Sequence, residues 1–230
     1  MTGFIQTSVY FGVAVSLIAY GAGSILQKRF RTALCNPLLI SIVLTILLLL
    51  TFDIDYDSYY SGAKYLSYFL TPATVCLAVP LYEKLDMLRE NKKAIILGIA
   101  SGVVTTLLCV LAIAVIFKLP HSDYVTLLPK SVTTAIGMGI SEELGGHITL
   151  TVAVIIITGL VGNICAPAVC RIFRISDPIA IGIAIGTSAH AIGTARALQM
   201  GEIEGAMSGL AIAVSGLLTV IGASIFAQFI

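Results

Sequence analysis

Charged side chains are scarce in this chain. Only 11% of its 230 residues are Asp, Glu, Lys or Arg, whereas 58% are hydrophobic, and the mean hydropathy is +1.03. A soluble domain of this size does not need that composition. The formal net charge is +1 and no basic tract stands apart from the apolar sequence, so nucleic-acid binding lacks its usual electrostatic support. We therefore expect a protein of the lipid bilayer that has no nucleic-acid partner.

Patterns typical of metal sites and enzymes are also missing. The five cysteines form no CxxC pair and have no histidine at metal spacing, so we expect them to pack as small apolar residues. Glu142, Glu143 and His147 do not follow the HExxH pattern, and the glycines between them break the helix, so the two glutamates are expected in solvent at the membrane mouth. No Asp lies within a neutral run, and no Ser–His pair shares an obvious helix face. The sequence predicts neither an enzyme nor a bound metal or cofactor.

Long neutral runs separate the few charged residues. Each run reaches about the 17 to 25 residues that a helix needs to cross the hydrocarbon core. The pattern predicts an all-α polytopic membrane protein with about six to eight membrane helices or half-helices, in a single integral membrane domain over residues 1–230. The neutral runs are 1–27, 32–52, 65–82, 94–117, 144–170, 178–195 and 205–230.

Basic residues predict the orientation of these runs, because they accumulate on the cytoplasmic side. The rule places residues 28–31 inside, the acidic loop 53–57 outside and the mixed loop 83–93 inside again. The run 94–117 then leads outside.

The path of residues 124–146 can be interpreted in two ways. The positive-inside rule places Arg171 and Arg174 inside again, which requires this segment to cross the membrane an even number of times. This segment then enters from outside and returns, which is the interpretation we prefer. The alternative is a broken helix that crosses and leaves both arginines outside. Residues 179–201, which are rich in glycine, can likewise span the membrane or re-enter from inside. Two re-entrant segments from opposite faces are typical of inverted repeats around a site at mid-membrane.

A weak internal similarity is compatible with repeat halves of about 1–117 and 118–230. AIGMGI at residues 135–140 is echoed by AIGTAR at residues 191–196, although apolar helices can match by chance. Small residues four apart, such as Gly98 with Gly102 and Gly182 with Gly186, predict close helix contacts within the chain or between chains.

The first polar interruption is LPKSVTT at residues 128–134. We expect Pro129 to begin a helix, with Lys130 and Ser131 at its positive end. Free N–H groups, a cation and the hydroxyls of Thr133 and Thr134 would together bind a carboxylate. Alternatively, Lys130 extends from the interface to water and the hydroxyls only cap the helix.

The second interruption is GTSAHAIGTAR at residues 186–196. Thr187 or Ser188 can cap a helix that carries His190 and Thr194 on one face, with Arg196 near its end. A histidine that titrates near neutral pH could couple solute movement to protons. The alternatives are that His190 is a packing residue and that Arg196 marks the membrane boundary.

The chain resembles the CidB/LrgB family of bacterial inner-membrane proteins. The matching segments lie in family order along most of the chain. One departure is Ala135, which stands where the family commonly has proline after KSVTT, so the position of the helix break there is less secure. The matching segments are NPLL at 36–39, YDSY at 56–59, TPATVCLAVPLYEKL at 71–85, LPKSVTT at 128–134, TSAHAIGTARAL at 187–198 and EGAMSGLA at 204–211.

The resemblance implies a multi-pass inner-membrane protein that works beside a small holin-like partner of the CidA/LrgA type. Family members are described as modulators of murein hydrolase activity and autolysis. Related proteins, including a plastid glycolate/glycerate translocator, imply transport of small monocarboxylates such as pyruvate or glycolate. The family is also distantly similar to cation/proton antiporters, which are built from inverted repeats.

Two hypotheses follow. The first is a transporter or facilitator of small carboxylates, in which the two interruptions form the binding site and the protein is a homo-oligomer. The second is a holin-like regulatory membrane component that modulates autolysis through protein partners. The substrate-binding residues expected under the first hypothesis are Lys130, Ser131, Thr133, Thr134, Ser188, His190, Thr194 and Arg196.

Overall fold

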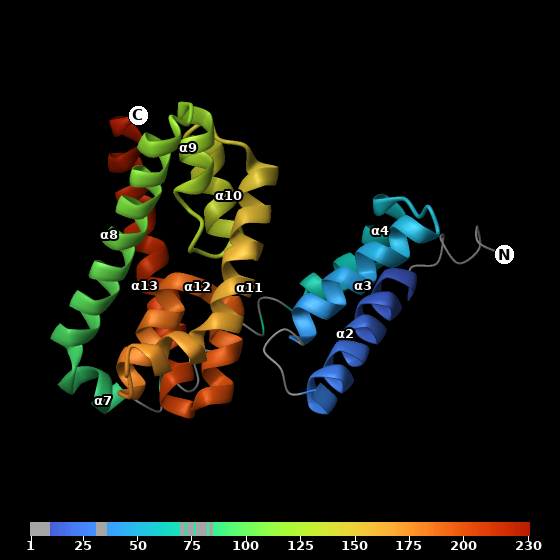
Figure 1. The fold of residues 1–230 in the computed structure, drawn as a ribbon, viewed down its shortest axis with the longest axis horizontal. Coiled ribbons are helices and arrows are strands. Elements are labelled where there is room, and N and C mark those ends of the chain that lie inside the picture. The colour runs from blue at the N-terminus through green and yellow to red at the C-terminus, as the bar shows by residue number, and fades with distance from the viewer. Residues whose placement is uncertain (1–9, 31–35, 70–71, 73–75, 77–81, 83–84) are drawn as a thin grey trace. The chain divides into compact units, whose positions relative to one another are not determined.

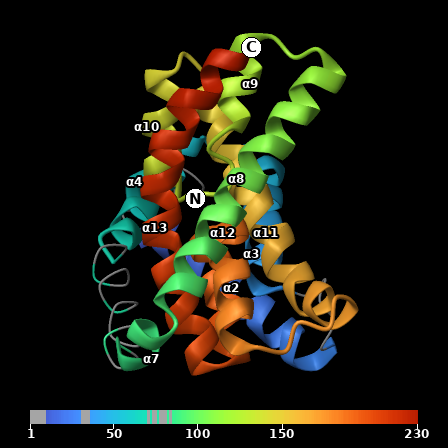
Figure 2. The same ribbon diagram turned by 90° about the vertical axis from the view of Figure 1, so that its left-hand side faces the viewer.

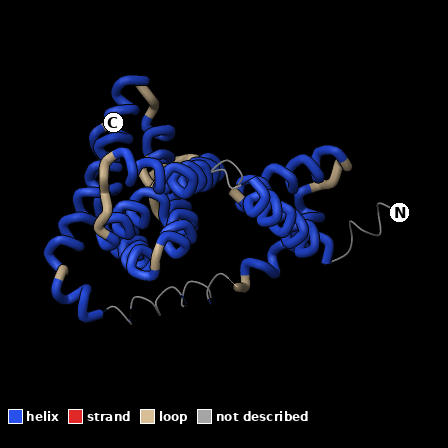
Figure 3. Tube along the Cα trace, turned by 60° about the horizontal axis from the view of Figure 1, so that its bottom comes forward, coloured by secondary structure: helices blue, strands red, loops and turns tan. Residues whose placement is uncertain are grey.

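The computed structural model describes residues 10–30, 36–69, 72, 76, 82 and 85–230. Throughout this part of the chain the elements are helices joined by loops, without a strand, as Figure 3 shows. Five of the described helices are long and apolar enough to cross a membrane. The predicted all-α polytopic membrane fold is therefore confirmed. The predicted run 65–82 and the segment 71–85 lie largely outside the described residues.

The chain forms two compact units, Met1–Cys76 and Leu77–Ile230. The first contains α2 (Tyr10–Phe30), α3 (Pro37–Thr51) and α4 (Tyr56–Ser67). Asn36 starts α3, because its side-chain oxygen accepts the N–H groups of Leu38 and Leu39 and a proline follows at the first helical position. The Ser16 and Tyr59 hydroxyls, 2.7 Å apart, connect α2 to α4.

The second unit is a bundle around three long helices. Its elements are α7 (Leu85–Glu90), α8 (Lys92–Phe117), α9 (His121–Leu127), α10 (Thr134–Glu143), α11 (Ile148–Ile172), α12 (Pro178–Met200), α13 (Glu202–Phe226) and a short 3-10 helix (Ala227–Phe229). Helices α8, α11 and α13 run between two ends of the unit, which we name the α7 end and the α9 end after the short helices found there (Figures 1 and 2). Ile99 and Leu107 of α8, Leu128 and Met207 are fully buried between these elements.

Helices α9 and α10 form a hairpin that starts and finishes at the α9 end. The turn after α9 leads into the bundle, where the first turn of α10 lies against Pro129. Helix α10 then returns, and the N–H of His147 donates to the hydroxyl of Thr126 in α9 at 2.7 Å. Residues 124–146 therefore enter and leave the second unit at the same end, as we predicted.

Helix α12 is also folded back on itself. Its backbone is interrupted at His190, which has φ 41° and ψ −141°. A Cβ on Gly182, in the first half, would lie 2.5 Å from the carbonyl oxygen of Glu204, and one on Gly205 would lie 3.2 Å from the Cα of Leu198, in the second half. Both halves thus pass the same turn of α13, one running with it and one against it. Although α12 is long enough to span a membrane, it starts and ends at the α7 end.

The charges at the two ends orient the second unit. The α9 end carries Lys118 with Asp123, Glu142 and Glu143, whereas most of the basic residues lie at the α7 end. Arg171 and Arg174 lie at the same end as Arg89, Lys92 and Lys93, as an even number of crossings by residues 124–146 requires. By the positive-inside rule we infer that the α7 end is cytoplasmic. The basic residues at that end are Arg89, Lys92, Lys93, Arg171 and Arg174.

Candidate functional site

The α9–α10 hairpin ends inside the bundle in a polar turn, residues 130–134, which we name the first tip. Ser131 is buried, while Lys130, Thr133 and Thr134 are half-buried. The prediction that Pro129 begins a helix is wrong. The N–H groups of Lys130 and Val132 instead close turns onto the carbonyls of Leu127 and Pro129.

Helix α10 begins only at Thr134, because Thr133 is extended, with ψ 151°. The break between α9 and α10 therefore forms without a proline at position 135. Thr133 makes no side-chain hydrogen bond to the first turn of α10, so the free N–H groups of that turn remain to be satisfied by another partner.

Lys130 places a positive charge at the first tip, beside the start of α10. Its ammonium Nζ donates to the hydroxyl of Ser131 at 3.1 Å. Among the described residues no Asp or Glu forms an ion pair with it. A half-buried cation beside the N-terminus of α10 makes the first tip electropositive.

The interruption of α12, residues 187–190, is the second tip. The structure contradicts the prediction that Thr187 or Ser188 caps the second half of this helix. Both hydroxyls donate backward into the first half, from Thr187 to the carbonyl of Ile183 at 2.8 Å and from Ser188 to that of Ala184 at 2.7 Å. The break comes at His190 itself, whose positive φ is uncommon outside glycine.

Side-chain contacts hold His190 in this conformation. Its Nε2–H donates to the backbone carbonyl of Ile155 in α11 at 3.0 Å, and its own carbonyl accepts the Thr194 hydroxyl at 3.0 Å. Thr194 lies in turn 2.7 Å from the Ser208 hydroxyl of α13. His190, Thr194 and Ser208 are all buried. Because the Ile155 carbonyl can only accept, the neutral imidazole must carry its hydrogen on Nε2.

The second tip packs against helix α11. A Cβ on Gly159 would lie 2.8 Å from Nε2 of His190, so only glycine leaves room for the ring there. Asn163, one turn further along, donates its amide to the carbonyl of Ile192 at 2.6 Å. At 1.5 Å per residue, Gly159 is about 17 Å from the start of a helix about 37 Å long. The second tip therefore lies near the middle of the bundle.

Ile155 connects the two hairpins. Its carbonyl accepts the His190 bond, while its side chain lies against Gly137 in the first turn of α10. Both hairpins therefore reach the same part of α11, one from each end of the unit.

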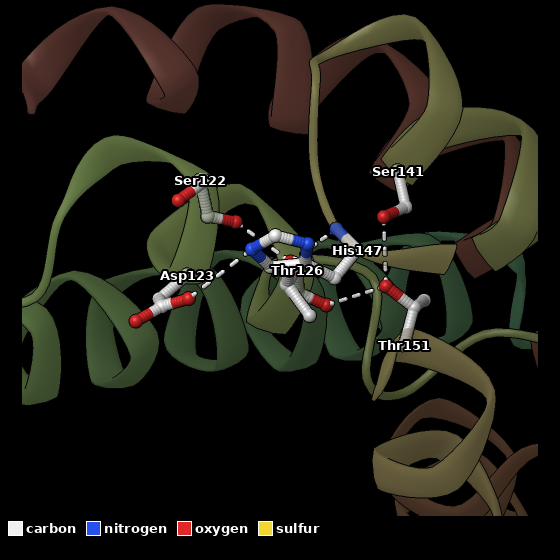
Figure 4. A network of polar contacts seen from close by, with 6 residues as sticks. All are labelled: Ser122, Asp123, Thr126, Ser141, His147 and Thr151. Atoms are coloured by element: carbon white, nitrogen blue, oxygen red, sulfur yellow. Dashed lines mark hydrogen bonds and ion pairs between the residues drawn. The ribbon is translucent and has the colours of Figure 1, made fainter. Parts of the chain in front are cut away.

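A polar network secures the first hairpin at the α9 end (Figure 4). The Thr126 hydroxyl accepts the His147 N–H and donates to the Ser122 carbonyl at 2.6 Å. The Thr151 hydroxyl of α11 lies 3.1 Å from the Thr126 carbonyl and 2.8 Å from the Ser141 hydroxyl of α10. Thr151 thus joins α11 to both α9 and α10, and Thr126 adds a second link between α9 and the start of α11.

The remaining predicted positions are distributed around these tips. Ser188 is exposed beside α8, and Arg196 lies in the second half of α12, where its guanidinium donates to Gln199 at 3.0 Å. Arg196 is therefore displaced from the second tip toward the α7 end.

Glu142 and Glu143 are exposed at the α9 end, as expected, and His147 Nε2 lies 3.6 Å from Asp123. Among the described residues no group of His, Cys, Asp and Glu has the arrangement of a metal site.

Comparison with known proteins identifies the family. The model of the LrgB-like family matches residues 16–229. The chain belongs to the LrgB-like family. It is 36% identical over 222 residues to the antiholin-like protein LrgB of Bacillus cereus strain B4264, with 96% of both chains covered. The antiholin-like protein LrgB of Bacillus anthracis strain CDC 684 matches to the same extent. No solved structure matches. With its long apolar helices, this LrgB-like protein is a multi-pass bacterial membrane protein.

Sequence analysis of the LrgB-like chain missed the α11 side of the site. Asn163 was a detectable signal, because an amide in the middle of an apolar run needs a hydrogen-bond partner inside the membrane. Ile155 offered no signal, since its contribution to the second tip is a backbone carbonyl. Thr126 lies outside the neutral runs and Thr151 lies in the first third of the run 144–170, and a single threonine at such a position gives no signal of its own.

Proposed function

We propose that this LrgB-like protein is an antiholin-like regulatory component of the bacterial inner membrane. In this role it modulates murein hydrolase activity and autolysis together with a small holin-like membrane partner. The observation that carries the proposal is the similarity to antiholin-like proteins over 96% of both chains, which leaves no large part of either without a counterpart.

The experiment measures detergent-induced lysis in a bacterial host that lacks its own LrgB-like proteins. Expression of this chain with a holin-like partner is expected to change the lysis rate and the murein hydrolase activity seen in gels, and the two proteins should co-purify from membranes. Unchanged lysis and hydrolase activity, without co-purification, would refute the proposal.

A second candidate function, facilitated movement of small monocarboxylates such as pyruvate or glycolate, is favoured by the first tip. Lys130 has no acidic partner among the described residues, and a cation removed from water is stabilised by an anion. The uncapped first turn of α10 adds free N–H groups beside it. A carboxylate could bind both groups at once.

In this proposal the eight predicted residues have different roles. Lys130, Ser131, Thr133 and Thr134 surround the anion, and the second tip closes the site from the cytoplasmic side through His190 and Thr194. Ser188 lies on the approach to the second tip. Arg196, nearer the α7 end, attracts anions toward it.

Uptake of radiolabelled pyruvate and glycolate into proteoliposomes tests this function, with and without a holin-like partner. Lys130→Gln should abolish saturable uptake because it removes the charge, while Lys130→Arg should retain part of it. Lys118→Gln is the matched control, since it removes a cation at the α9 end outside the tip. Equal uptake by wild type and Lys130→Gln would exclude the proposed site.

A further inference from the structure

A groove lies between α8 and the first half of α12, inside the second unit. Its volume is about 660 Å³. It runs from Asn91 and Asp177 at the α7 end to Thr106 and Ser188 halfway along the bundle. The two helices lie side by side in Figure 2. The groove therefore connects the cytoplasmic end with the second tip.

The face of α8 that lines the groove is more polar than the adjacent exposed face of the same helix. Ser101 and Thr105 are exposed along the groove, whereas Leu97 and Val104 are 69% and 48% exposed without lining it. Large apolar side chains suit lipid, and hydroxyls suit water. The α8 side of the groove thus offers hydroxyl groups that water can solvate, while Ile179, Ala180, Ile183 and Ala184 line the α12 side.

The hydroxyls that line the groove are oriented by the helices themselves. Ser101 donates its hydrogen to the carbonyl of Gly98 at 2.9 Å, and Thr187 and Ser188 donate to carbonyls within α12. Each hydroxyl has one hydrogen, so the three oxygens present only acceptor lone pairs to the groove. Thr105 and Thr106, with no such bond among the described residues, can orient either way.

The charged group of the groove is negative, as are the lone pairs of these oxygens. Among the described residues that line the groove, Asp177 is charged and none is Lys or Arg. The first half of α12 ends at the deep end of the groove, just beyond Thr187 and Ser188. The lone pairs and the carboxylate favour a cation over an anion.

We propose that this groove is a water-filled entrance for small monovalent cations from the cytoplasmic side, with a binding site for such a cation at its deep end beside Thr187 and Ser188. A single carboxylate at the mouth and neutral oxygens at the deep end suit one positive charge, because divalent cations are usually held by several carboxylates. The cation site is separate from Lys130. It shares Ser188 with the carboxylate proposal but does not depend on either proposed function.

Cysteine accessibility tests the entrance in a version of the protein whose five native cysteines are replaced. Ser101→Cys and Ser188→Cys should react with a cationic methanethiosulfonate added at the cytoplasmic face. Val104→Cys, on the same helix as Ser101, is the matched control and should stay unreactive because it faces lipid. Relative to a free thiol in solution, the cationic reagent should be favoured over its anionic counterpart by about tenfold.

Direct binding tests the site. Saturable binding of radioactive Na⁺ or Rb⁺ to the protein in lipid nanodiscs is expected, and Ser188→Ala should weaken it by about tenfold, as for loss of one favourable oxygen ligand. Ser224→Ala is the matched control, because Ser224 is exposed on α13 and makes the same type of hydrogen bond, to Val220 at 3.0 Å.

Three results would overturn the proposal. Groove cysteines as unreactive as Val104→Cys would mean that lipid fills the groove. Preference for the anionic reagent would reverse the assigned charge selectivity. Absence of saturable binding, or equal binding by Ser188→Ala and the wild type, would remove the deep site. None of these measurements requires lysis or carboxylate uptake, so this inference can fail independently of both proposed functions.

Discussion

Asn163 in α11 donates its side-chain amide to the backbone carbonyl of Ile192 across 2.6 Å, just beyond the break of α12. Ile192 lies in the first turn after the break, and a carbonyl oxygen can accept a side-chain hydrogen bond in addition to its helical one. The Asn163 amide, in the middle of an apolar helix, finds in it the partner that the bilayer does not supply. The amide therefore stabilises the folded-back form of α12. Together with Ile155, which accepts the His190 bond, it holds the second tip from both sides of the break.

Asn163→Leu should destabilise the protein, because leucine has a similar size but cannot donate to the Ile192 carbonyl. The expected loss is roughly 0.5–1.5 kcal/mol, the net contribution of one intramolecular hydrogen bond. Thermal unfolding of the purified protein, followed by helical circular dichroism, measures it. Ser224→Ala, which also removes a hydrogen bond but at an exposed position, should unfold near the wild-type temperature. Equal midpoints for Asn163→Leu and wild type would show that the amide does not hold the tip.

Gly159→Ala should displace His190, since the added methyl group would lie 2.8 Å from both Cε1 and Nε2 of its ring. We expect a lower unfolding temperature, because the ring cannot keep its bond to Ile155 without a shift of α11 or α12. Gly139→Ala in α10 is the control: nothing lies within 4 Å of its added Cβ, so better helix propensity should leave stability unchanged or raise it by about 0.5–1 kcal/mol. If both variants behaved alike, the close fit between Gly159 and His190 would be refuted.

Thr126→Val should loosen the first hairpin at the α9 end. Valine keeps the branched shape of threonine but cannot accept the His147 N–H or donate to the Ser122 carbonyl. Hydrogen exchange of the α10 amides should become faster, since local opening needs less free energy once the network is broken. Thr149→Val, at an exposed position of α11, makes the same substitution outside the network. Unchanged α10 exchange in Thr126→Val would mean that other contacts hold the hairpin.

The sequence was sufficient to predict the membrane class and the two interruptions, because charge scarcity and run length are global properties. It also indicated re-entry of residues 124–146, since the basic residues after α11 require an even number of crossings there. For residues 179–201 composition left spanning and re-entry equally open. The deciding information is the approach of Gly182 and Leu198 to one turn of α13, a tertiary contact that no local pattern contains.

Local rules also misplaced both helix starts. A proline in a first turn and a hydroxyl at an N-cap are statistical preferences, and tertiary contacts overrode them here. Thr187 and Ser188 bond backward because the first half of α12 continues past them to His190. His190 takes its unusual φ because α11 provides an acceptor at Ile155 and open space at Gly159.

The folded-back path of α12 leads to the strongest topological prediction. Ser176 precedes this helix and Glu202 follows it, and both are exposed. The residues between them are numerous enough to cross a bilayer once as a helix. A crossing helix would put the two positions on opposite faces, whereas the hairpin puts both on the cytoplasmic face.

Single cysteines at these positions, in the version without native cysteines, distinguish the two cases. An impermeant maleimide should label Ser176→Cys and Glu202→Cys in inverted vesicles and leave both unlabelled in intact cells. Glu143→Cys, exposed at the α9 end, should show the reverse and thus confirms that the vesicles are sealed. Labelling of Glu202→Cys from outside, with Ser176→Cys labelled only from inside, would make α12 a true span. The second tip would then no longer approach the first from the opposite face, and the binding site between them would lose its structural basis.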